Sequence, residues 1–94
     1  MRGVSFMQDN AKIKCNNIPY RKGFIEIMSN IHKGLVNLET WNIHVDVDIK
    51  NLNLGVDDFP EDAVTGNTEI ELSIDDAKGL IKLLQQAISD VESA

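Results

Sequence analysis

The clearest pattern along the chain is a set of apolar residues near its C-terminus that recur at spacings of three and four. At about 3.6 residues per turn, these positions fall on one side of a helix, which the pattern predicts over residues 74–91. Ser73 is a suitable N-cap because its hydroxyl can accept a hydrogen bond from a first-turn amide. Asp75 and Asp76 place negative charge at the positive end of the helix dipole. The apolar positions are Ala77, Leu80, Ile81, Leu84, Ala87, Ile88 and Val91.

Apolar and polar residues alternate strictly over ten residues in the middle of the chain, from Trp41 to Lys50. Successive side chains of a strand point to opposite faces of a sheet, so this pattern predicts the central strand of the fold. Residues 69–72 alternate in the same way. Ile70 and Leu72 are expected to face the core while the two glutamates face solvent.

Shorter segments complete the expected elements. Residues 24–28 favour a strand after a turn signal, and residues 11–15 are a weaker strand candidate. Residues 30–40 fit either one face of a helix or a strand that enters the Trp41 segment, and the pattern leaves both open. Residues 55–67 carry acids and glycines without apolar periodicity, which predicts an acidic loop.

This order of elements predicts an α+β fold, a small antiparallel β-sheet with one C-terminal amphipathic α-helix packed on one face. A chain of 94 residues is expected to form a single domain, residues 1–94. One helix covers only one face of a sheet, and the edge strands still need pairing or protection. We therefore expect a homodimer, formed through a sheet edge or through the helix.

Composition narrows the class of protein. No apolar run approaches the about 20 residues of a membrane-spanning helix, and residues 1–10 lack the apolar core of a secretory signal. The single cysteine, Cys15, cannot form an internal disulfide, as is usual in a reducing compartment. These features predict a cytoplasmic protein with no membrane partner.

Charge is distributed unevenly along the chain, whose net charge is -6. Residues 1–33 carry six bases and two acids, whereas residues 34–94 carry three bases and thirteen acids. Either the basic third lies against the acidic remainder, or the acidic part is a surface for a basic partner. A pI near 4.7 sets long-range repulsion against phosphate, so direct binding of nucleic acid is not expected.

The acidic residues supply the first functional hypothesis. A sheet face and a loop that present a row of negative charge can resemble a phosphate backbone, which fits a non-catalytic inhibitor or adaptor that engages a basic, nucleic-acid-binding protein surface. The plainer alternative is that the acids only keep a small protein soluble. The candidate partner-binding residues are Asp46, Asp48, Asp57, Asp58, Glu61, Asp62, Glu69 and Glu71.

A second hypothesis is a dimeric small-ligand binder. Tyr20, Arg21, Lys22 and Trp41 combine aromatic and basic side chains, which suit an anionic metabolite or a nucleotide. In this case the dimer would form the pocket.

The sequence offers no motif of known catalytic chemistry, so we expect neither an enzyme nor a cofactor. His44 and the neighbouring strand carboxylates could attract a divalent cation, but alternate residues of a flat strand seldom converge on one ion, and no metal site is expected. Cys15 is expected to be a half-buried core residue rather than a nucleophile, since no catalytic motif accompanies it.

Overall fold

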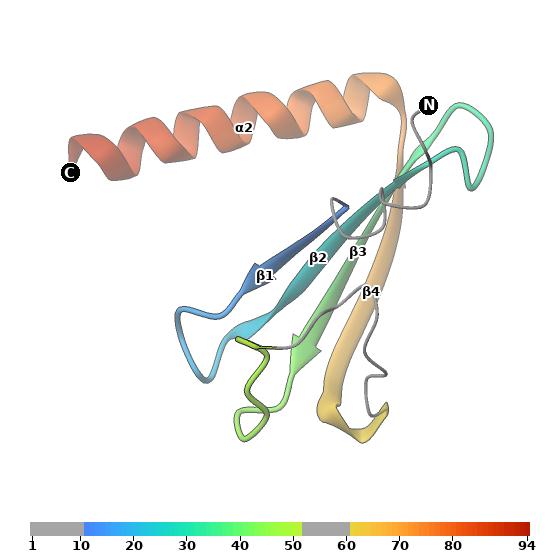
Figure 1. Ribbon diagram of the computed structural model, residues 1–94. Helices are drawn as coiled ribbons and strands as arrows, with labels where there is room; N and C mark the ends of the chain where they lie inside the picture. The colour runs from blue at the N-terminus through green and yellow to red at the C-terminus, as the bar shows by residue number, and fades with distance from the viewer. Residues whose placement is uncertain (1–10, 52–60) are drawn as a thin grey trace.

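Figure 1 shows the computed structural model, which describes residues 11–51 and 61–94. These residues form a four-stranded antiparallel sheet, in the order β1-β2-β3-β4, followed by one α-helix. The α+β architecture expected from the sequence is confirmed. The elements are β1 (Lys12–Cys15), β2 (Lys22–Ser29), β3 (Val36–Ile43), the short 3-10 helix η1 (Glu61–Ala63), β4 (Val64–Leu72) and α2 (Ile74–Ser93).

Helix α2 begins where its periodicity and cap predict. The Asp76 amide donates to Ser73 Oγ at 3.0 Å, and the Ser73 amide donates to the Asp76 carboxylate at 3.3 Å. This reciprocal pair is a capping box, which satisfies backbone donors that the first helical turn leaves free. The helix continues two residues beyond the predicted end at residue 91.

The strands expected at residues 24–28 and 11–15 are confirmed as β2 and β1. The ambiguous residues 30–40 divide between a turn and the strand β3. Asn30 and Gly34 have φ angles of 62° and 81°, and the Asn30 amide donates to the Leu35 carbonyl at 3.0 Å, which closes the β2–β3 connection. Such left-handed backbone favours Gly and Asn and does not continue a helix.

The strand expected from Trp41 to Lys50 is wrong beyond Ile43. There the chain turns, since the Val47 amide donates to the His44 carbonyl at 3.0 Å. The Asp46 amide donates to His44 Nδ1, and the Lys50 amide donates to the Asp48 carboxylate. Short-range bonds of this kind compete with a strand ladder, although the apolar alternation continues through them. The predicted loop 55–67 is also too long, because β4 begins at Val64.

Strand pairing gives the sheet two contrasting faces. We call one of them the glutamate face, because paired positions across its four strands form a row of Lys12, Glu26, Glu39 and Glu69. The same face also carries Phe24, Trp41 and Glu71. The isoleucine face carries apolar residues from all four strands and, at its paired positions, no charged residue. Its apolar residues are Ile13, Ile25, Ile27, Val36, Leu38, Ile70 and Leu72.

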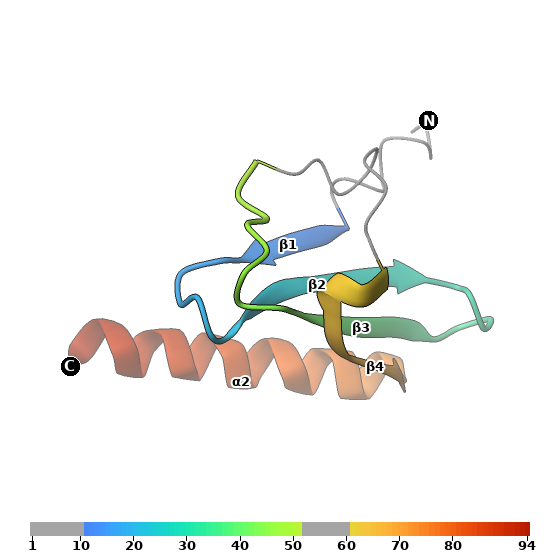
Figure 2. The ribbon, with the colours of Figure 1, turned by 90° about the horizontal axis from the view of Figure 1, so that it is seen from below.

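The buried core lies at one end of the glutamate face. Phe24 and Ile43 are buried there, and Ile49 folds back over them with no exposed surface. Figure 2 shows residues 44–51 on one side of the sheet and α2 on the other. The expectation that Ile70 faces the core is therefore wrong, because its side of the sheet is not the one that residues 44–51 cover, and Ile70 is 51 % exposed.

Helix α2 lies on the side of the isoleucine face, yet its apolar surface stays open. No residue of α2 is buried, and its main contacts with the sheet are with β4. The helix leaves the end of β4 and runs at an angle away from the other strands in Figure 1, and Figure 2 shows it on the side of the sheet opposite residues 44–51. The close packing of helix on sheet that the sequence predicts is thus not made within this chain. Within residues 11–51 and 61–94, no helix has the length and hydrophobicity needed to cross a membrane.

Candidate functional site

Three glutamates on adjacent strands form a row across the glutamate face. Glu26 of β2 pairs with Glu39 of β3, which in turn pairs with Glu69 of β4. Directly opposite residues of antiparallel strands have Cβ atoms about 5 Å apart, and like charges at that spacing destabilise a sheet. The row is therefore a concentrated source of negative potential.

The partners of this row offset only part of its charge. At one end, Lys12 Nζ lies 3.9 Å from the Glu26 carboxylate, and both side chains are largely buried. The Asn67 amide nitrogen donates to Glu39 at 3.0 Å. The charge therefore concentrates toward β4, where Glu69 is exposed.

Glu71 extends the acidic surface along β4 toward the helix. Its Oε2 lies 3.3 Å from His32 Nδ1 in the β2–β3 turn, an ion pair when the imidazole is protonated. Its Oε1 is buried without a hydrogen-bond partner, as are both polar atoms of Asn37, the residue directly opposite on β3. Unpartnered buried polar atoms are costly, so this end of the face is polar and incompletely satisfied.

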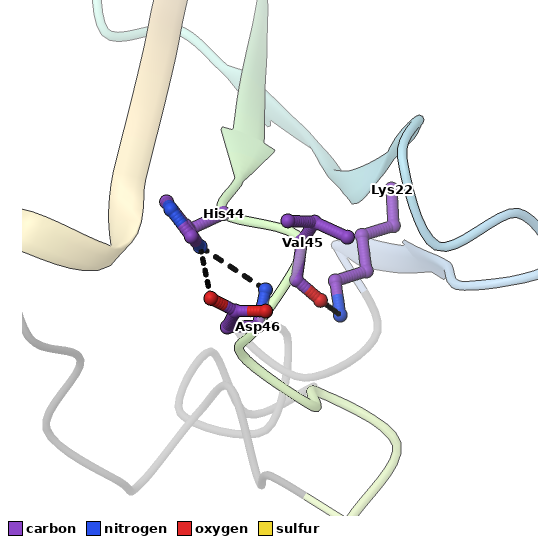
Figure 3. A network of polar contacts seen from close by, with 4 residues as sticks. All are labelled: Lys22, His44, Val45 and Asp46. Carbon is purple, nitrogen blue, oxygen red and sulfur yellow. Dashed lines mark hydrogen bonds and ion pairs between the residues drawn. The ribbon is translucent and has the colours of Figure 1, made fainter.

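The acids of the turn after β3 lie at the end of the sheet away from α2 (Figure 1), and Figure 3 shows one of them, Asp46, beside His44. Asp46 is directed back toward His44, whose Nδ1 accepts the Asp46 amide at 3.0 Å. That nitrogen uses its lone pair in this bond, so its 3.8 Å approach to the Asp46 carboxylate adds no hydrogen bond. The Asp46 side chain is 86 % exposed and free to meet a partner.

The structure separates the predicted acidic residues into two groups. Glu69 and Glu71 lie on β4, whereas Asp46 and Asp48 lie in the 44–51 segment and Asp62 lies in η1. The shared strand face that would align Asp46 and Asp48 with the β4 glutamates is therefore not formed. Glu61 opens η1, and Asp57 and Asp58 lie outside the described residues.

Sequence reasoning missed Glu26 and Glu39, which complete the glutamate row. Glu39 falls in the segment whose pattern fits helix or strand, and Glu26 lies within an apolar strand. Only the strand register places Glu39 opposite Glu69 and Glu26 opposite Glu39. The available signal was that Glu39 precedes Trp41 by two residues, and hence shares its face if the segment is a strand.

The residues of the alternative ligand site do not form a shared basic pocket. Tyr20 and Arg21 are exposed in the β1–β2 turn. Lys22 is 7 % exposed, and its Nζ donates to the Val45 carbonyl at 3.1 Å (Figure 3). Trp41 stacks on Phe24 with ring centroids 5.5 Å apart. Lys22 and Trp41 thus share the glutamate face, but the lysine binds backbone and the indole belongs to the core.

Cys15 is exposed, which corrects the expectation of a half-buried core residue, because β1 is an edge strand with few neighbours on its second side. Within the described part of the chain, no group of three or more His, Cys, Asp or Glu side chains could hold a metal ion.

Comparison of the whole chain with protein-family models, with curated proteins and with solved structures finds no match.

Proposed function

We propose that this protein is a non-catalytic interaction protein, an inhibitor or adaptor that binds a basic protein surface through its acidic residues. The observation that carries the proposal is the row of Glu26, Glu39 and Glu69 on three adjacent strands. A basic partner would offset a repulsion that the row leaves partly uncompensated. The single exposed cysteine supports a cytoplasmic setting for such a role.

The partner would be recognised by charge over an extended surface. Glu69 and Glu71 form the part of this acidic surface that lies on β4. Asp46, Asp48 and Asp62 form a second acidic group near the core end of the sheet. Two separated acidic groups suit a surface with several spaced Lys or Arg side chains, such as one that binds a phosphate backbone. Asp57 and Asp58 lie outside the described residues, and with Glu61 they stay candidates for this contact from the sequence alone.

A lysine- and arginine-rich peptide is the probe for the first test, with binding followed by fluorescence anisotropy at low and high salt. We expect the affinity to fall steeply as salt rises, because exposed ion pairs are screened. Glu69→Gln and Asp46→Asn should each weaken binding about two- to fivefold, the effect of losing one exposed ion pair.

Asp90→Asn is the matched control, because it removes the same charge from α2, away from both acidic groups. It should leave the affinity nearly unchanged. Binding that ignores salt, or an Asp90→Asn variant that loses as much as Glu69→Gln, would contradict the proposal, since the net charge alone would then explain any attraction.

The alternative function, binding of an anionic metabolite or nucleotide, finds less support in this arrangement. The Lys22 ammonium already donates to backbone, and Tyr20 and Arg21 lie in an exposed turn. The favourable observation is that Trp41 Nε1 is buried without a hydrogen-bond partner and could donate to a ligand. Saturable binding of a nucleotide that Arg21→Ala abolishes would favour this alternative.

A further inference from the structure

Two apolar surfaces of this chain lie on the same side of the sheet, and no element among residues 11–51 and 61–94 covers them. On the isoleucine face, Ile13 and Ile70 are 58 % and 51 % exposed. On α2, an arc of about 140° at 3.6 residues per turn holds eight apolar side chains, with Glu92 of the last turn at its edge. Those residues are Ile74, Ala77, Leu80, Ile81, Leu84, Ala87, Ile88 and Val91, and none of them is buried.

The link between β4 and α2 holds these surfaces apart. Ser73 is the one residue between Leu72 and Ile74, with φ -70° and ψ 170°. Its backbone amide and its hydroxyl both bond to Asp76 in the capping box. The capping box stabilises this one-residue link in the conformation that places α2 as observed.

The helix is also too long for its own sheet to cover if it crosses the strands. Its 20 residues make it about 30 Å long, whereas four strands at about 4.8 Å spacing span about 14 Å. In both views its C-terminal end projects past the β1 side of the sheet (Figures 1 and 2). Leu84, Ile88 and Val91, with Ala87 and Glu92, line a shallow hollow in this projecting half.

The chain exposes more surface than a compact monomer of its mass, and many of its exposed large apolar side chains lie on these two surfaces. The accessible surface of the chain is 7199 Å², whereas a folded monomer of 10.5 kDa exposes about 5,400 Å². This excess belongs to the whole chain. Among the exposed large hydrophobic residues of the described ranges, Ile13, Ile27 and Ile70 lie on the isoleucine face, and Ile74, Ile81, Leu84, Ile88 and Val91 lie on α2. The radius of gyration, 14.8 Å, likewise exceeds the about 12.4 Å of a compact domain of this length.

We propose that a second copy of this chain covers these surfaces, in a two-fold dimer in which the α2 helix of each copy packs on the isoleucine face of the other. A second copy fits because it brings both an apolar helix face and an apolar sheet face. In a two-fold dimer each helix then covers the sheet of the other copy, so that all four apolar surfaces are buried. The paired positions of the isoleucine face carry no charge, and the apolar side of α2 carries only Glu92 at its edge in the last turn, so the acidic chains can meet there. The glutamate faces stay outside this interface, and the two proposals are independent.

The test is sedimentation equilibrium of the chain alone, over a range of concentrations and without any basic partner. We expect the wild type at twice 10.5 kDa. Ile88→Asp on the helix and Ile70→Asp on the sheet should each sediment as monomers, because each places a charge in the apolar interface. Ser89→Asp, next to Ile88 but on the polar side of α2, should remain a dimer.

Mixing the two monomeric variants identifies which surfaces meet. A mixed pair contains one wild-type helix facing one wild-type sheet, so dimers should form again. A monomeric wild type would overturn the proposal, as would an Ile70→Asp variant that stays dimeric, the result expected if helix packs on helix. Circular dichroism verifies that each variant keeps its strands, and Ile13→Asp replaces Ile70→Asp if that variant does not.

Discussion

Gly23 shows how one position of β2 restricts the residue it can hold. A Cβ atom built there would lie 1.8 Å from the Trp41 carbonyl oxygen on the neighbouring strand. The obstacle is backbone that belongs to the β2–β3 ladder, so it cannot swing aside as a flexible side chain would. Close approach of two backbones is one of the few reasons for glycine within a strand.

We predict that Gly23→Ala lowers the free energy of unfolding by about 1 to 3 kcal/mol, the usual cost of overpacking. Chemical denaturation followed by tryptophan fluorescence measures the loss, because Trp41 lies on the adjacent strand. Gly79→Ala is the control. Nothing lies within 4 Å of that site in α2, so the better helix former should be neutral or stabilising by up to about 1 kcal/mol. Equal effects at both glycines would disprove the backbone clash.

At the scale of elements, local signals explain α2 better than they explain the strands. Its start is marked by Ser73 and Asp76, which are close in sequence and bond to each other. The segment after Ile43 has the opposite character, because it alternates like a strand but turns through bonds made by His44 and Asp48. The alternating residues Ile43, Val47 and Ile49 reach the core through a strand end and a folded-back turn, whereas Val45 is exposed.

The capping box makes the start of α2 testable. Ser73→Ala removes the hydroxyl that accepts the Asp76 amide, which costs about 1 kcal/mol at a typical N-cap. Amide hydrogen exchange in the first turn of α2 should accelerate roughly fivefold as a result. Ser89→Ala, within the same helix, should leave that exchange rate unchanged. An unchanged rate in Ser73→Ala would mean that the cap does not determine helix stability.

At the scale of the whole molecule, the sheet has one covered and one uncovered side. Residues 44–51 cover the core end of the glutamate face, whereas Ile13 and Ile70 of the isoleucine face and the apolar side of α2 are exposed in the described part of the chain, and we propose that a partner covers them. If that partner is a second copy, folding and association are linked, and stability depends on protein concentration.

We therefore predict that the melting temperature of the wild type rises with protein concentration, by mass action on the folded dimer. The Ile88→Asp variant should melt at one temperature at all concentrations, and below the wild type. Differential scanning calorimetry at several dilutions provides the measurement. A wild-type transition that does not move on dilution would contradict linked folding and dimerisation.

The sequence by itself determined the α+β class, the position of α2 with its cap, and the strands β1, β2 and β4 in outline. These features depend on residues near one another in the chain, where apolar period and capping chemistry act directly. It also identified Glu69 and Glu71 as acidic residues of a strand. Local patterns sufficed for these because each concerns one element.

Only the tertiary structure decided which side of the sheet became buried and which acids stand together. The glutamate row joins Glu26, Glu39 and Glu69, residues separated by long stretches of chain and brought together by strand register alone. Likewise, periodicity marks the apolar face of α2 but does not determine what covers it. Register and packing depend on contacts between distant residues, and apolar attraction is non-directional, so a pattern along one chain cannot distinguish its own sheet from that of a second copy.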